Sequence, residues 1–212
     1  MNPFDELVEE VKERFLDVRK SHDWDHTWRV LNLCLHIGEK EGADLEILKL
    51  AALLHDIGRE EQDINNGKVC HAQRGGEIAR ELLEKHGYSP EIMERVAHCI
   101  ETHRFRGDKK PRSKEARVLY DADKLDAIGA IGIGRAFVFA GEVGARVHNK
   151  GVDLGKTRSY SREDTAYREF MVKLRQVKDR MLTEEGKRIA RDRHRYMVDF
   201  FDRLNREVEG EI

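Results

Sequence analysis

The chain has 212 residues, and 38% of them are charged, yet 39 Lys and Arg against 41 Asp and Glu leave a formal net charge of only -2. This length suits one domain with a substantial core. The near balance of charge argues against a protein that coats DNA or an anionic membrane through bulk charge.

Cysteine use and the chain's first residues indicate the compartment. Cys34, Cys70 and Cys99 are an odd number without CxxC spacing, which argues against a disulfide framework or a zinc–thiolate site and favours a reducing environment. The first residues are charged and amphipathic rather than a signal peptide. No apolar run approaches the ~20 residues of a membrane span. We therefore expect a cytoplasmic protein with no membrane contact.

Apolar residues recur every three or four positions through almost the whole chain, which is the helical period. The predicted helices cover about 2–19, 23–41, 44–56, 71–87, 89–104, 113–128, 130–142, 162–181 and 183–208. Strand-type alternation is essentially missing, so the predicted fold class is all-α.

Capping residues support several of these ends. Asn2-Pro3 and Ser89-Pro90 each place a capping residue before a proline at the first helical position. The other signals are Asp23, Ser161 followed by Asp164, and Thr183 for helix starts, and Gly87 for a helix end. We interpret residues 57–70 as a polar loop. Residues 143–160 hold three glycines, several basic residues and a tyrosine, and are either a lid or a mobile connection.

The segment from Leu50 to Gly58 carries the first sign of chemistry. An apolar helix end delivers the adjacent His55 and Asp56, and Gly58 then stops the helix. A buried ionised aspartate is costly unless it is paired or bound to a metal. Taken alone, the pair is equally consistent with a structural His–Asp contact.

Two further segments repeat this theme. His22 and His26 lie four residues apart in the segment 21–30. The apolar helix predicted around 120–126 contains the acids Asp121, Asp123 and Asp126. Two imidazoles and two carboxylates form a ligand set suited to one divalent ion of the Mn, Fe, Co, Ni, Zn or Mg type.

The order H…HD…D resembles the HD-domain superfamily of metal-dependent phosphohydrolases, and most closely its small, nucleotide-pyrophosphatase-like members. The matching motifs are HDWDHTWRV, AALLHDIGR, DADKLDAIGAIGIGRAF and a tail from Thr183 to Met197. The resemblance implies a single HD-domain helical bundle over 1–212. Its core would cover about 20–130, the C-terminal helices at about 162–208 would pack on that core, and a long polar loop or lid would lie near 143–160.

Carried over by position, the resemblance implies that His26, rather than His22, binds the metal together with His55, Asp56 and Asp123. His22 and His98 would then serve in the core or beside the ligands. Asp56 would also touch the nucleophilic water. His71 and His103 would contact phosphate or water, and a second ion at these two histidines stays open.

The general base is not assigned by the sequence. Some family members carry a glutamate three residues after the HD aspartate, where this chain has Arg59. Glu60 is our candidate for the base, with Glu61 and Asp126 as alternatives. Further contacts to phosphate are expected from Arg59 and Lys124 beside the ligand motifs, and from Lys150 and Tyr160 in the long loop.

The resemblance implies a small phosphorylated substrate, most plausibly a nucleoside triphosphate cleaved to monophosphate and pyrophosphate. A nucleoside monophosphatase, a cyclic-nucleotide phosphodiesterase and a (p)ppGpp hydrolase are alternatives, as is a non-catalytic metal- or nucleotide-sensing module. The basic segment 104–114 is better explained as a solvated loop than as a nucleic-acid contact. An apolar stripe on the last helix could form a homodimer, although core packing is favoured: Met197, Phe200, Phe201 and Leu204.

Overall fold

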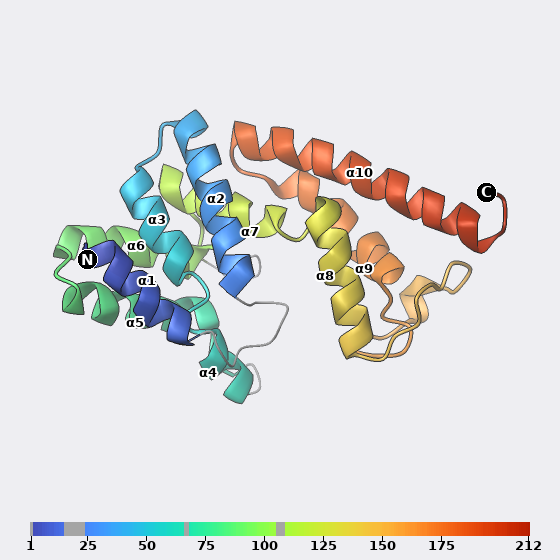
Figure 1. The fold of residues 1–212 in the computed structure, drawn as a ribbon, viewed down its shortest axis with the longest axis horizontal. Helices are drawn as coiled ribbons and strands as arrows, with labels where there is room; N and C mark the ends of the chain where they lie inside the picture. Colours follow the sequence, from blue (N-terminus) through green and yellow to red (C-terminus); the bar gives the residue numbers. More distant parts are fainter. Residues whose placement is uncertain (1, 15–23, 66–67, 105–108) are drawn as a thin grey trace. The chain divides into compact units, whose positions relative to one another are not determined.

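The computed structural model describes residues 2–14, 24–65, 68–104 and 109–212, and helices account for most of these ranges (Figure 1). They contain no strand, so the predicted all-α class is confirmed. None of the described helices has the length and apolar character needed to span a bilayer. The chain divides into two compact units, Met1–Asp123 and Lys124–Ile212. The predicted packing of the C-terminal helices on the core stays a prediction.

The first unit is built around the apolar helix α3. Its helices are α1 (Pro3–Arg14), α2 (Trp24–Glu41), α3 (Leu45–Leu54), α4 (Arg59–Ile64), α5 (His71–Lys85), α6 (Pro90–Thr102) and most of α7 (Lys114–Leu125). Helices α1, α2 and α6 pack against α3, and α5 packs against α4 and α6. Every residue from Leu50 to Leu54 is buried, because α3 has neighbours on several sides.

Helix starts in this unit follow the capping rules. Ser89 accepts a hydrogen bond from the backbone N–H of Ile92, and Pro90 opens α6, as predicted. Asn2 accepts one from the N–H of Asp5 at the start of α1. The expected cap at Asp23, the histidine at position 22 and the predicted continuation of the first helix over 15–19 lie outside the described residues.

The second unit has its own core. Its helices are α8 (Gly129–Glu142), the short 3-10 helix η2 (Leu154–Lys156), α9 (Ala166–Val172), the 3-10 helix η3 (Leu174–Arg180) and α10 (Glu184–Val208). Helix α8 packs against α9 and α10, and the ring of Phe170 stacks on that of Phe201 at 4.6 Å between centroids. Met197 and Phe201 are buried, so these two residues of the apolar stripe serve the core. Thr183 caps α10, as predicted.

Two predicted element boundaries were wrong. Residues 57–70, predicted as a loop, contain α4, which is too short to show a helical period. The predicted helix 162–181 starts only at Ala166 and gives way to η3, because Thr165 rather than Ser161 caps it. Asp164 is not part of a capping box, since its carboxylate accepts from the N–H of Tyr160 and pairs with Arg168.

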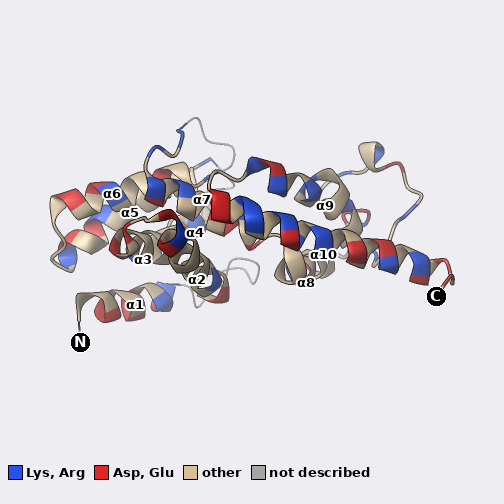
Figure 2. Ribbon diagram, turned by 90° about the horizontal axis from the view of Figure 1, so that it is seen from above, with Lys and Arg blue, Asp and Glu red and all other residues tan. Residues whose placement is uncertain are grey.

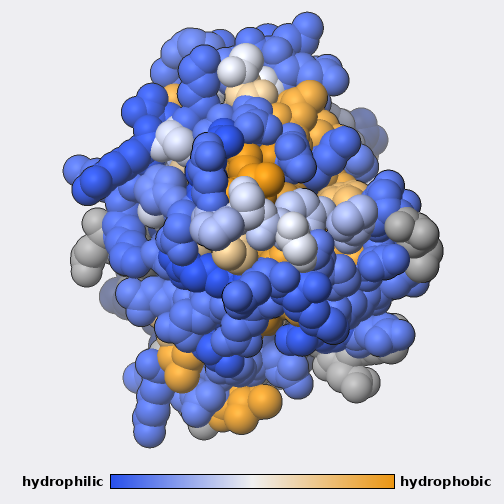
Figure 3. Space-filling view, turned by 90° about the vertical axis from the view of Figure 1, so that its left-hand side faces the viewer, coloured by the Kyte–Doolittle hydropathy of each residue, from blue (hydrophilic) through white to orange (hydrophobic). Residues whose placement is uncertain are grey.

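Charged residues cover the helix surfaces in both signs. Lys and Arg alternate with Asp and Glu along α10 and the other exposed helices (Figure 2). The face drawn in Figure 3 is largely hydrophilic, and hydrophobic side chains reach it only in small areas. Several of these charges form pairs one helical turn apart, such as Arg188 with Glu185 at 2.7 Å. The high charge content therefore belongs to solvated helix faces.

Candidate metal centre

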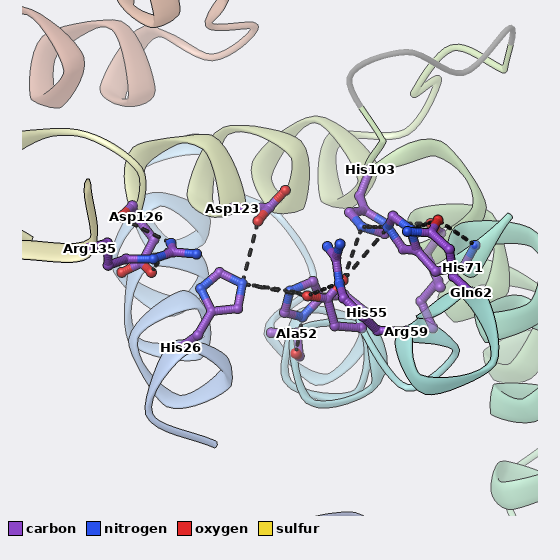
Figure 4. Close-up of polar contacts among 12 residues, drawn as sticks. His26, Ala52, His55, Arg59, Gln62, His71, His103, Asp123, Asp126 and Arg135 are labelled. Carbon is purple, nitrogen blue, oxygen red and sulfur yellow. Dashed lines mark hydrogen bonds and ion pairs between the residues drawn. The ribbon is translucent and has the colours of Figure 1, made fainter. Parts of the chain in front are cut away.

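Three elements bring the predicted ligands together in the first unit (Figure 4). His26 lies in the first turn of α2, His55 ends α3 and Asp56 follows it, while Asp123 lies near the end of α7. His26, His55 and Asp56 are at most 2% exposed, and Asp123 is half-buried. A buried carboxylate is unstable unless a cation or hydrogen-bond donors lie beside it, so the convergence of these side chains indicates a binding site for a cation.

Their donor atoms stand at distances that suit coordination. The Nε2 atoms of His26 and His55 are 3.2 Å apart, and His26 Nε2 is 3.5 Å from Asp123 Oδ1. Asp56 Oδ2 lies 3.8 Å from His26 Nε2 and 3.7 Å from His55 Nε2. Neighbouring donors that each lie about 2.1 Å from one ion stand about 3.0 to 3.5 Å apart. The distances from His26 Nε2 to His55 Nε2 and to Asp123 Oδ1 meet this spacing, and the two distances to Asp56 Oδ2 are slightly outside it.

His55 is held in the form that binds metals. Its Nδ1–H donates to the carbonyl of Ala52 at 2.8 Å, which leaves a lone pair on Nε2. Burial lowers the pKa of His55 to about 4, so the ring is neutral at neutral pH. A neutral imidazole with a free Nε2 is ready to act as a ligand without losing a proton.

A second group of donors lies on the other side of Asp56. The Nε2 atoms of His71 and His103 are 3.3 Å apart, and each lies 3.7 Å from Asp56 Oδ1. His71 Nδ1–H donates to Gln62 Oε1 at 2.8 Å, and His103 Nδ1–H donates to the carbonyl of Ile100 at 2.6 Å. Burial lowers the pKa of His71 to about 3. His71 therefore presents the lone pair of its Nε2 toward His103 in a buried place, where it favours a cation or a hydrogen-bond donor.

Asp56 joins the two groups. Its Oδ2 faces His26 and His55, and its Oδ1 faces His71 and His103. Arg59 contacts both oxygens, with Nε donating to Oδ2 at 3.0 Å and a terminal nitrogen to Oδ1 at 2.9 Å. His26, His55 and Asp123 form one set whose ligand atoms all lie within 4.8 Å of one another, and Asp56, His71 and His103 form another. Imidazole nitrogens with carboxylate oxygens are ligands for divalent transition metals. The residues therefore fit a metal ion.

The three acids considered as the general base lie in different surroundings. Glu60 is exposed on α4, and Glu61 pairs with Arg74 at 2.8 Å. Asp126 belongs to the second unit, where it is buried and pairs with Arg135 at 2.7 Å. Asp126 is thus engaged in a structural ion pair.

The other residues predicted to contact the substrate do not form one cluster. Lys124 follows Asp123 directly on α7, while Lys150 pairs with Glu209 in the second unit. Tyr160 is 73% exposed with its ring against Phe139 and a left-handed backbone at φ 57°. A part for Lys150 and Tyr160 in binding stays a prediction.

Several supporting residues were not found from the sequence. Gln62, which fixes the tautomer of His71, lies in the stretch interpreted as a loop. The two backbone carbonyls lie three residues before their histidines, an offset that is common in helical turns and carries no signal of its own. His98, expected near the core, is half-buried and accepts from the N–H of Arg112 at 3.2 Å.

Comparison with known proteins identifies the family of this chain. Residues 23–128, half of the chain, match the HD domain. The uncharacterised protein YpgQ of Bacillus subtilis is 37% identical over 204 residues, which are 94% of this chain and 91% of that protein. The chain belongs to the HD-domain family. The predicted ligand residues His26, His55, Asp56 and Asp123 all lie within the matched range.

Solved structures resemble this HD-domain protein over nearly its whole length. The crystal structure of Bacillus subtilis YpgQ in complex with ADP superposes with a TM-score of 0.74 at 32% identity, over 97% of this chain and 94% of that one. An HD-superfamily hydrolase from Bacillus thuringiensis gives a TM-score of 0.76 at 29% identity, over 97% and 96%. Ribonuclease Y of Chloroflexus aurantiacus is 36% identical over 100 residues, 47% of this chain but 17% of that protein.

Proposed function

We propose that this protein is a metal-dependent phosphohydrolase whose catalytic divalent ion is bound by His26, His55, Asp56 and Asp123. The observation that carries the proposal is the convergence of imidazole nitrogens and carboxylate oxygens in a buried place, at distances close to those of a coordination sphere. A bound divalent ion supplies an acidified water and a positive charge for the phosphate oxygens. The similarity to HD-superfamily hydrolases supports this reading.

We further propose that the substrate is a nucleotide, with a nucleoside triphosphate cleaved to monophosphate and pyrophosphate. The support is that YpgQ, alike over nearly the whole chain, was crystallised with ADP. A nucleoside diphosphate offers both a base and adjoining phosphates, so it does not separate pyrophosphate release from monophosphate or (p)ppGpp hydrolysis. The products of the reaction decide among these.

The residues around Asp56 take the following parts in this proposal. Arg59 and Lys124 supply cationic contacts to the phosphate, and Asp56 orients the attacking water from its buried position. Glu60 is the proposed base, because it is an exposed acid beside Arg59 whereas Glu61 is engaged with Arg74. His71 and His103 bind either a second divalent ion or a water. The stoichiometry of metal binding distinguishes these two parts. The predicted contact of His71 to phosphate would need a proton on Nε2, which a neutral ring whose Nδ1–H is engaged with Gln62 does not offer.

The proposal is tested by a substrate panel with the metal-reconstituted protein. Nucleoside tri-, di- and monophosphates, a cyclic nucleotide and (p)ppGpp are each offered with Mn, Co, Ni or Mg, and phosphate and pyrophosphate are measured separately. We expect pyrophosphate from at least one triphosphate, and no product from Asp56→Ala. Glu60→Gln should lower the rate by about 10²-fold or more if Glu60 is the base.

Absence of any product across all substrates and metals would overturn the enzyme reading and favour a sensing module. Turnover unchanged in Asp56→Ala would instead overturn the assignment of the site. A cytoplasmic location and a homodimer stay predictions, and size measurement in solution checks the second.

A further inference from the structure

Arg59 makes a two-pronged contact with Asp56. Its Nε and one terminal nitrogen donate to the two carboxylate oxygens at 3.0 and 2.9 Å, the geometry that guanidinium and carboxylate prefer. The Asp56 side chain is only 1% exposed, and a carboxylate so buried is unstable without a cation beside it. Arg59 supplies that cation from within the chain.

The contact uses the same oxygens that a metal ion would need. Oδ2 faces His26 and His55, and Oδ1 faces His71 and His103. These distances, 3.7 to 3.8 Å, are wider than the 3.2 Å between His26 and His55. Both carboxylate oxygens thus face imidazole nitrogens on one side and Arg59 on the other.

A guanidinium and a divalent cation on one buried carboxylate repel each other, and the low local dielectric strengthens that repulsion. We infer that Arg59 and the divalent ion compete for Asp56, so that metal loading releases Arg59 from the carboxylate. This rests on the proposed function. It also explains how Arg59 becomes available for phosphate only in protein that carries its metal.

The surroundings permit the side chain to move while its helix stays. Arg59 is 18% exposed and lies in the first turn of α4. Helix α4 is tied to α5 by two other contacts, Glu61 with Arg74 at 2.8 Å and Gln62 with His71 at 2.8 Å. Release of Arg59 from Asp56 therefore requires a change of side-chain rotamer and no unfolding of α4.

The test compares Arg59→Gln with Arg95→Gln in the full chain. Both remove one positive charge, but Arg95 pairs with Asp44 on the surface and not with a ligand. Mn²⁺ affinity is measured by titration calorimetry, and the thermal midpoint is measured in chelator-treated and Mn²⁺-saturated protein. We expect Arg59→Gln to bind Mn²⁺ about tenfold more tightly, the scale of one charge-assisted hydrogen bond, and to lose thermal stability only in the chelator-treated form.

Unchanged or weaker Mn²⁺ binding by Arg59→Gln would overturn the inference, as would an equal loss of thermal stability in both forms. If Arg59→Gln does not fold, Arg59→Lys replaces it, because a lysine cannot hold both oxygens at once, and tighter Mn²⁺ binding is again expected. Neither readout uses a substrate. If the wild-type protein binds Mn²⁺ but turns over no substrate, only the proposed function is contradicted. If it binds no divalent ion, both the proposed function and the competition between Arg59 and the metal are contradicted.

Discussion

At the scale of residues, burial keeps His55 and His71 neutral, and hydrogen-bond partners behind the two rings orient them. His55 is fully buried, and its Nδ1–H is bound to the carbonyl of Ala52, so its free nitrogen points to the other ligands. His and Asp at an apolar helix end are chemically unusual and drew attention to this place, and the resemblance to HD-domain proteins then implied the four candidate ligands. The sequence could not predict Gln62, because a glutamine in a polar stretch is ordinary until the fold places it beside His71.

The lowered pKa values of His55 and His71 predict acid sensitivity in chelator-treated protein. Unfolded histidine has a pKa of about 6.5, whereas the pKa values of folded His55 and His71 are about 4 and about 3. Below pH 6.5 the unfolded chain therefore binds protons that the folded protein does not bind. The free energy of unfolding should therefore fall between pH 6.5 and 5 by on the order of 1 kcal/mol per histidine. Urea unfolding at several pH values measures this.

This pH window lies above the usual carboxylate pKa values, so acids add little to the slope. His36→Gln, which removes an exposed histidine of α2, should keep the same dependence. A free energy that is flat from pH 6.5 to 5 would contradict the account of these rings.

Gln62 tests the role of the second group. Gln62→Leu leaves the Nδ1–H of His71 without its acceptor, and loss of such a supporting contact costs about 10- to 100-fold in metal affinity or activity. We expect turnover at saturating Mn²⁺ to fall by that factor. Gln73→Leu makes the same change at an exposed position of α5 and should be neutral. Equal turnover in the two variants would show that His71 needs no such support.

At the scale of elements, close backbone approach sets the geometry behind the ligands. A Cβ added to Gly58 would lie 2.6 Å from the carbonyl oxygen of His71 and 2.7 Å from the backbone nitrogen of Gly75. The turn after Asp56 therefore sits directly on α5. The sequence indicated Gly58 only as a helix stop, since a contact between residues far apart in the chain leaves no local pattern. For the same reason it missed α4, which is held by α5 rather than by its own period.

Gly58→Ala should therefore separate the turn from α5. We expect a loss of about 1–3 kcal/mol in the free energy of unfolding, as for other overpacked sites, together with weaker Mn²⁺ binding. Gly134→Ala is the matched control, because an added Cβ there meets nothing within 4 Å on α8, and alanine favours a helix by up to about 1 kcal/mol. Denaturant unfolding of both variants checks the pair. Gly58→Ala as stable as wild type would show that the turn can shift freely.

At the scale of the whole molecule, the helical period of the apolar residues predicted the all-α class, and the composition predicted a surface balanced in charge. No feature of the sequence indicated the division into two compact units. No Pro- or Gly-rich linker separates the units, because α7 itself carries the chain from Asp123 to Lys124. The site residues assigned to the metal all belong to the first unit.

Charge balance also predicts weak contact with nucleic acid, although 100 residues of the chain are 36% identical to ribonuclease Y of Chloroflexus aurantiacus. With a net charge of -2, the protein lacks the excess of cations that drives counterion release. A mobility-shift assay with single-stranded RNA at about 100 mM salt should show no complex at micromolar protein. A complex whose affinity falls steeply with salt would contradict this.

The central claim is that His26, His55, Asp56 and Asp123 hold the catalytic ion, and crystals grown with MnCl₂ test it most directly. The account predicts an anomalous difference peak within about 2.3 Å of the Nε2 atoms of His26 and His55 and of one carboxylate oxygen each of Asp56 and Asp123. A second peak beside His71 and His103 would show that this group also binds metal. Fully occupied Mn²⁺ elsewhere, with no peak among these ligands, would contradict the account.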